Sequence, residues 1–283
     1  MELADDPIPR AATLYDIFIN PAVRDADILI AGLAFWFALQ HGSYWLLNAF
    51  NPTFRRLKPA DKDDLCVRIC AVVNGICSLR AAYLYVFVAP NLGAGLYTTM
   101  PEYFAPLMWL VSYFTWDFFV CLWYGWGVAY TLHAFVSGFG MYLAAYPHSH
   151  LYTGYYSGVF EVSNVFLHGA FVLRKLELYP RLCTVFDVIF AVLFMSIRVI
   201  GGTYVAYSWC CVMGSATLRG EVHSAWVCWY SLVTIWIVNG LSYYWSGTLI
   251  KAVMETLSPT KELAPSPTTR DKKQFPQYPD HKN

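Results

Sequence analysis

The chain has 283 residues, of which 57% are hydrophobic, 18% aromatic and only 13% charged. Soluble domains carry about 25% charged residues, so this composition excludes an ordinary soluble domain. The 19 basic and 19 acidic side chains cancel, which removes the positive excess expected of a nucleic-acid-binding protein. Together with a mean hydropathy of +0.41, these values predict an all-α integral membrane protein.

Seven segments are apolar over roughly 20 residues, the length that a helix needs to cross a bilayer. They are 28–50, 65–89, 104–123, 126–146, 151–173, 182–207 and 225–250. The sequence therefore predicts seven transmembrane helices, preceded by segment 1–27 and followed by a tail, 256–283. The tail mixes prolines with polar and charged residues and has no apolar periodicity, so we expect it to be disordered.

The loops between these segments differ in basic charge. Residues 251–283 and the loops after the first, third and fifth segments hold thirteen Lys and Arg residues, against three on the opposite side. Basic loops are retained in the cytosol. The asymmetry therefore predicts a cytosolic C-terminus and a lumenal or extracellular N-terminus.

The eight cysteines lie mostly inside apolar segments and show no CxxC spacing, so neither a zinc site nor a disulfide framework is expected. Adjacent Cys210 and Cys211 are candidates for lipidation or oxidation because they lie near a predicted membrane edge. No metal site is predicted.

Polar side chains within the predicted spans are costly in hydrocarbon, so we expect them to face the bundle interior. At 1.5 Å per residue, five of them lie about 8 to 14 Å from the predicted cytosolic ends: Asp117, His133, Asn164, His168 and Asp187. Helical spacing places Tyr130 and Asn239 on interior stripes as well. Such stripes are also typical of simple helix–helix packing. We predict that His133, Asn164 and Asp187 line a cavity open to the cytosolic leaflet.

Three charged residues lie deeper, with Glu161 at about 18 Å and Arg80 and Arg198 at about 22 and 24 Å. A lone carboxylate at that depth is unfavourable, so we predict that Glu161 is paired with Arg80 or Arg198. The tentative catalytic residues are His133, Glu161 and Asp187, because His133 titrates near neutral pH and lies on a polar stripe. The predicted substrate contacts are Asp117, Tyr130, Asn164, His168 and Asn239.

Two stretches, Thr131-Leu132-His133-Ala134 and Phe160-Glu161-Val162-Ser163-Asn164, resemble the histidine and aspartate motifs of the ceramide synthases. Tyr113-Phe114-Thr115-Trp116-Asp117 and the basic helix end Phe171-Val172-Leu173-Arg174-Lys175-Leu176 resemble the same family, the TLC domain proteins. The resemblance covers about residues 61–255. It implies a six-helix bundle, made by the second to seventh spans, that encloses a cavity for a long acyl chain, with the first span packed outside.

The differences from the ceramide synthases concern the reacting groups. Ala134 stands in place of the second histidine, Glu161 in place of one aspartate and Asn164 in place of the other. An amide does not accept a proton as a carboxylate does. The chain therefore resembles the TLC domain proteins tied to membrane-lipid composition more than the established synthases.

Our leading hypothesis is a non-enzymatic or weakly enzymatic protein of lipid homeostasis in the endoplasmic reticulum, with membrane lipids or acyl chains as partners. The alternative is an acyltransferase that uses His133 as general base and acyl-coenzyme A as co-substrate, with no other cofactor. A seven-helix receptor or a transporter is a third class, but there is no Asp-Arg-Tyr at the end of the third span and no visible inverted repeat. The sequence does not predict an oligomeric state.

Overall fold

The computed structural model describes residues 12–88, 96–97, 103–147 and 151–257. Within these ranges every regular element is a helix, in agreement with the predicted all-α class. The first eleven residues and most of the predicted tail, from residue 258 onward, lie outside the described residues, so the expected disorder of the tail stays a prediction.

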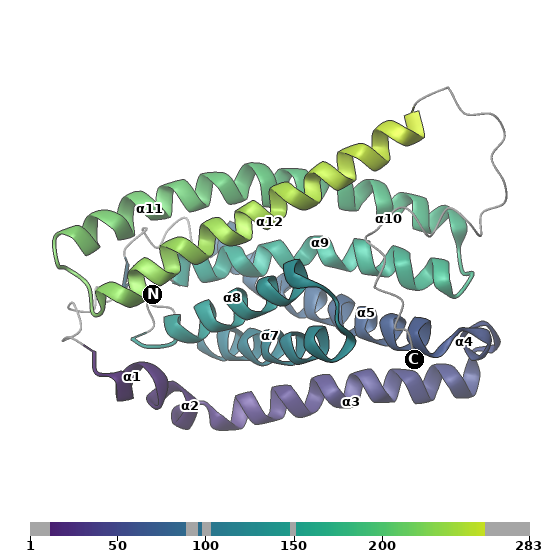
Figure 1. Cartoon of the computed structure of the whole chain (residues 1–283), viewed down its shortest axis with the longest axis horizontal. Coiled ribbons are helices and arrows are strands. Elements are labelled where there is room, and N and C mark those ends of the chain that lie inside the picture. Colours follow the sequence, from purple (N-terminus) through teal and green to yellow (C-terminus); the bar gives the residue numbers. More distant parts are fainter. Residues whose placement is uncertain (1–11, 89–95, 98–102, 148–150, 258–283) are drawn as a thin grey trace.

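The long helices lie side by side along the long axis of the molecule (Figure 1). In chain order the elements are α1 (Leu14–Phe18), α2 (Asn20–Arg24), α3 (Ala26–Phe50), α4 (Pro52–Arg56), α5 (Pro59–Cys77), α6 (Leu79–Tyr83), η1 (Leu84–Val88), α7 (Phe104–Tyr124), α8 (Val128–Ala144), α9 (Leu151–Lys175), α10 (Pro180–Leu193), η4 (Phe194–Gly201), α11 (Gly202–Leu218) and α12 (Ala225–Leu257). The elements η1 and η4 are π-helical and continue the α-helices around them.

Four helical segments of the described chain are long and apolar enough to cross a membrane. They are Pro59–Val88, Phe104–Tyr124, Pro180–Leu218 and Ala225–Met254. Val128–Ala144 is also apolar but has only 17 residues. The chain is thus a helical protein with the features of a membrane protein, and the count of seven crossings stays a prediction.

Local sequence signals explain where the helices begin and end. Proline begins α4, α5 and α10, a position where its missing N–H would have no intrahelical partner. Helix α7 ends at Gly125, whose φ of 64° lies in the left-handed region that favours glycine. Gly127, with a φ of 84°, precedes α8, so two glycines make the tight reversal between α7 and α8.

Helix α3 packs along the outside of α7 and α5, at the lower edge of Figure 1. Gly32 allows the close approach, because a Cβ there would lie 2.1 Å from Ser112 Oγ. The fully buried Trp36 donates its indole N–H to Ser112 Oγ at 3.3 Å, and Trp116 donates to Gln40 Oε1 at 3.2 Å. Buried indole hydrogen bonds thus fix α3 against the bundle.

Residues 12–25, which we call the N-terminal strap, cross the end of the bundle where α8 ends and α12 begins. The strap begins with the Ala12 N–H, which donates to the His223 carbonyl at 3.0 Å. Ile17, with only 1% of its surface exposed, packs in a cluster with Leu143 and Val227. A capping box between Thr13 and Asp16 starts α1.

His223 lies in the loop between α11 and α12, outside the membrane-spanning segments. The Tyr97 hydroxyl lies 2.9 Å from its Nδ1 and accepts its backbone N–H at 2.7 Å. Only 2% of the residue is exposed, and this burial lowers the pKa of His223 to about 4. The imidazole is therefore neutral in the folded protein at neutral pH.

We expect the protein to lose stability as the pH falls from about 6.5, the usual pKa of an exposed histidine, toward about 4. In that window the unfolded chain takes up a proton at His223 that the folded chain excludes. Thermal unfolding in detergent measures the effect. The His223→Gln variant should lose less stability over the same window, and parallel pH curves for the two proteins would contradict this prediction.

Candidate functional site

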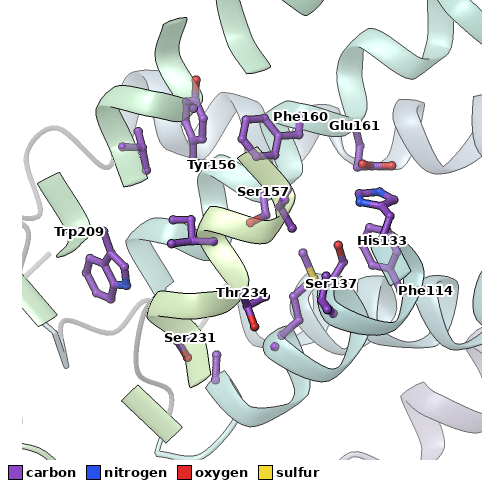
Figure 2. Close-up of a pocket in the computed structure, with 18 of the residues that line it drawn as sticks. Phe114, His133, Ser137, Tyr156, Ser157, Phe160, Glu161, Trp209, Ser231 and Thr234 are labelled. Carbon is purple, nitrogen blue, oxygen red and sulfur yellow. The ribbon is translucent and has the colours of Figure 1, made fainter. Parts of the chain in front are cut away.

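A cavity of about 100 Å³ lies inside the bundle, between α7, α8, α9, α11 and α12 (Figure 2). Most of its wall is apolar, from residues such as Leu107, Val136 and Val238. His133 and Glu161 lie together at one end, while hydroxyl groups such as those of Ser157 and Thr234 are spread along the wall (Figure 2). Trp209 and Ser231 lie at the opposite end. The cavity is therefore an apolar space with one ionisable end.

Glu161 of α9 forms a buried ion pair with Arg198 of η4. The Arg198 Nη2 lies 3.2 Å from Glu161 Oε1, and both residues are only 2% exposed. The other carboxylate oxygen accepts hydrogen bonds from Asn74 Nδ2 at 3.0 Å and from Asn164 Nδ2 at 3.1 Å. The carboxylate thus connects three segments of the chain, which satisfies the requirement that a buried charge be paired and hydrogen-bonded.

Close helix packing brings these groups together. A Cβ at position 75 would lie 2.8 Å from the Glu161 carbonyl, so only a glycine lets α5 approach α9 closely enough for Asn74 to reach the carboxylate. Arg198 also donates to the Phe160 carbonyl at 3.2 Å, and its guanidinium lies 5.3 Å from the Phe160 ring centroid. Arg198 is held by a π-helical turn, a feature that is common at functional sites.

His133 of α8 is held between two aromatic rings. Its ring centroid lies 5.7 Å from that of Phe114 and 5.5 Å from that of Trp245, both nearly perpendicular to it. Its Nδ1 is buried and has no hydrogen-bond partner among the described residues. Buried polar atoms are normally hydrogen-bonded, so a water molecule or the polar group of a ligand would satisfy this nitrogen.

The family model of the TLC domain matches residues 64–251, about two thirds of the chain. The chain belongs to the TLC domain family. The resemblance read from the motifs around His133 and Glu161 is thereby confirmed at the level of the family. A search of curated proteins finds no match to this chain.

In this TLC domain, Asp187 does not belong to the site. It is exposed, and it accepts a hydrogen bond from Arg174 at 2.6 Å. Arg174 lies in the last turn of α9 and Asp187 about two turns into α10, so the pair joins two successive helices at the surface. The prediction that Asp187 lines a cavity with His133 is wrong, and its catalytic role stays a prediction.

Arg80 is likewise not the partner of Glu161. The face of α6 that meets α9 carries Ala81, and a Cβ at Gly158 would lie 2.4 Å from the Ala81 Cβ. Arg80 lies on the exposed surface instead. Of the two predicted partners, the structure places Arg198 beside Glu161.

The direction of the cavity also differs from the prediction. Asn164 contacts Glu161 but does not line the cavity. From His133 the wall continues along Ala144, Trp209 and Ser231, toward the loop between α11 and α12. In the predicted orientation this is the lumenal half of the bundle, so the cavity extends away from the predicted cytosolic side. The orientation and the expected opening toward the cytosolic leaflet stay predictions.

The remaining predicted substrate contacts do not line the cavity either: they are Asp117, Tyr130, His168 and Asn239. His168 Nδ1 lies 3.2 Å from Arg68 Nη1, near the end of α9 that is predicted to be cytosolic. Asn239 lies directly behind the cavity wall, because its Oδ1 would lie 2.9 Å from a Cβ at Gly202, which lines the wall. These residues surround the site without facing its interior.

Asn74 is the functional residue that the sequence reasoning missed. It is fully buried and donates to Glu161. The available signal was a single amide in an apolar stretch, Ala71-Val72-Val73-Asn74-Gly75, directly before a glycine. The sequence predicted no polar stripe on its helix, so hydrophobic periodicity alone did not single it out.

We expect Glu161→Leu to destabilise the protein by about 3 to 5 kcal/mol, because Arg198 would remain buried without its counter-charge. The double variant Glu161→Leu/Arg198→Met should be destabilised less than Glu161→Leu alone, since it removes both charges. Thermal and denaturant unfolding in detergent measure both. If Glu161→Leu were as stable as the wild type, the ion pair between Glu161 and Arg198 would not contribute to the stability of the bundle.

Proposed function

We propose that this TLC domain protein binds the acyl chain of a membrane lipid in its cavity and acts in lipid homeostasis without chemistry of its own. The observation that carries the proposal is a mainly apolar cavity with a histidine and a carboxylate together at one end. An acyl chain suits the apolar wall, and the headgroup or carbonyl of the lipid suits the hydrogen-bonding capacity at His133. The ligands are therefore membrane lipids, and no metal or organic cofactor is required.

The volume of the cavity limits what it holds at rest. At about 100 Å³ it is smaller than the roughly 150 Å³ apolar cavity that holds one benzene molecule. A short segment of an acyl chain fits this space, and a long chain requires its walls to move apart. Binding of a long-chain lipid should therefore be coupled to an opening of the bundle.

The geometry around His133 favours binding over catalysis. A general base is normally oriented by a second polar group, and the Glu161 carboxylate already accepts hydrogen bonds from Arg198, Asn74 and Asn164. Asp187, the other predicted orienting group, lies outside the bundle. His133 thus lies at the polar end of the cavity without a carboxylate committed to it.

An acyltransferase is the second candidate function. It is favoured by the buried Nδ1 of His133, which has no partner in the described chain and lies at the junction of the polar and apolar parts of the cavity. In that reaction His133 would accept the proton of an amine or hydroxyl as it attacks the thioester carbonyl of acyl-coenzyme A. The new amide or ester bond would form as the C–S bond breaks, and the proton would pass to the departing coenzyme A thiolate, giving free coenzyme A.

For the cellular setting we propose the endoplasmic reticulum membrane, with a lumenal N-terminus and a cytosolic C-terminus. The apolar helices and the family support an integral membrane protein. The thirteen-to-three excess of basic residues in one set of loops supports the orientation.

We expect the purified protein to carry co-purified lipid and Gly140→Leu to reduce it at least about tenfold, because the new side chain fills the cavity wall between α8 and α12. Mass spectrometry of extracted lipid measures the bound amount. Gly42→Leu is the matched control, since a side chain there meets nothing within 4 Å. Equal lipid in both variants, or none in the wild type, would contradict binding in this cavity.

His133 separates the two candidate functions. If the protein only binds lipid, His133→Gln should retain most of the bound lipid and no turnover of acyl-coenzyme A should occur. If it is an acyltransferase, His133→Ala should lower turnover about 10²- to 10⁴-fold while the protein still binds lipid. The measurement is release of free coenzyme A by wild type and both variants in lipid nanodiscs. Wild-type turnover that depends on His133 would favour the acyltransferase.

A further inference from the structure

The N-terminal strap contacts the same two helices whose inner faces line the cavity. On α8, Gly140 and Ala144 face the cavity, while Leu143 packs against the strap. On α12, Thr234 faces the cavity, while Val227 packs against the strap. The strap therefore bridges the outer side of the boundary between α8 and α12, which we call the α8–α12 seam.

The seam combines one close approach at a glycine with aromatic contacts on either side of it. A Cβ at Gly140 of α8 would lie 3.4 Å from Thr234 Cγ2 of α12. At one end Trp245 stacks on Tyr130, with ring centroids 5.7 Å apart. Toward the other end, Phe139 contacts Tyr230 at 5.2 Å. Between these aromatic contacts, Ser137 and Gly140 of α8 and Thr234 of α12 present small side chains to the cavity.

Four specific contacts attach the strap across this end of the seam. Phe18 stacks on Trp226, the second residue of α12, with ring centroids 5.7 Å apart. Its carbonyl accepts the hydroxyl of Tyr142 on α8. Ile17 is buried against both helices, and Arg24 donates to the Ala145 carbonyl at 3.2 Å. One short segment thus ties α8 and α12 together.

The strap has little stability of its own. Its two helices have five residues each, far below the length at which an isolated helix is stable in water. The order of the strap therefore depends on these contacts, and such segments open at a lower free energy than the core.

We propose that the N-terminal strap is a clasp that holds the α8–α12 seam shut, and that its release opens a lateral route from the membrane to the cavity. The inference rests on the proposed binding of lipid in that cavity. It accounts for how a cavity too small for a long acyl chain is filled: the chain enters through the seam as the small side chains separate. The clasp then sets the rate of lipid exchange.

The test measures access to the cavity directly. Thr234→Cys places a thiol on the buried cavity wall, and a small membrane-permeant thiol reagent modifies it only when the seam opens. Modification is followed by peptide mass spectrometry, so the native cysteines stay in place. In that background, Ile17→Ala/Phe18→Ala should raise the rate of modification about tenfold or more, because truncating the buried Ile17 and the half-buried Phe18 shifts the opening equilibrium by at least that factor.

The matched control is Leu14→Ala/Tyr15→Ala, which changes two exposed side chains of the same strap and should leave the rate unchanged. The native Cys70, fully buried between α5 and α3, reports general loosening of the bundle. Equal rates at position 234 in both variants would overturn the proposal. Parallel increases at position 234 and Cys70 would also overturn it, since the strap would then be a general stabiliser.

A milder variant keeps the test decisive if the double variant does not fold. Tyr142→Phe removes only the hydrogen bond to the Phe18 carbonyl and should raise modification at position 234 by a few-fold. An unchanged rate would overturn the clasp. Failure of the clasp and failure of lipid binding are separable, because thiol access needs no lipid and the lipid content of the wild type needs no strap variant.

Discussion

Taking the Glu161 carboxylate and the Arg198 guanidinium out of water costs several kcal/mol for each ion, and only close, well-bonded packing offsets that cost. The two groups lie 3.2 Å apart, and Asn74 and Asn164 complete the carboxylate. The arrangement exists only while α5, α9 and η4 stay in contact. The pair therefore fixes the centre of the bundle, and the polar end of the cavity lies where it does because Glu161 lies there.

Holding this pair limits what the site does. A carboxylate committed to an arginine and two amides is a poor orienting group for His133, whereas an apolar cavity that ends at the pair is well suited to a lipid chain. In the proposed binding of lipid, His133 would meet the polar group of the ligand, because its buried Nδ1 has no partner among the described residues. The same residues thus provide stability, and they define one end of a binding site.

The cavity exists because the helices around it present small side chains to one another. Gly140, Ser157 and Gly202 face inward from three different helices. In a membrane, lipid tails are as apolar as the helices, so the hydrophobic effect does not drive the helices together. Small residues instead let the helix backbones approach closely, and this close packing stabilises the contact. The N-terminal strap packs on the outer side of the boundary between α8 and α12, which is why it is the segment that we propose controls access to the interior.

The sequence by itself determined the helical, membrane-type class, the helix positions and the family, because apolar length, helical period and the motifs around His133 and Glu161 are local properties of the chain. It also selected Glu161 and Arg198, since charges inside apolar segments are conspicuous. Only the tertiary structure decided which partners meet. The depth of a residue along a helix does not say which way its side chain faces. Asp187 and Arg80 face the surface, whereas Asn74 faces the interior and contacts Glu161. The cavity extends from His133 toward the loop between α11 and α12, away from the end that the sequence predicted.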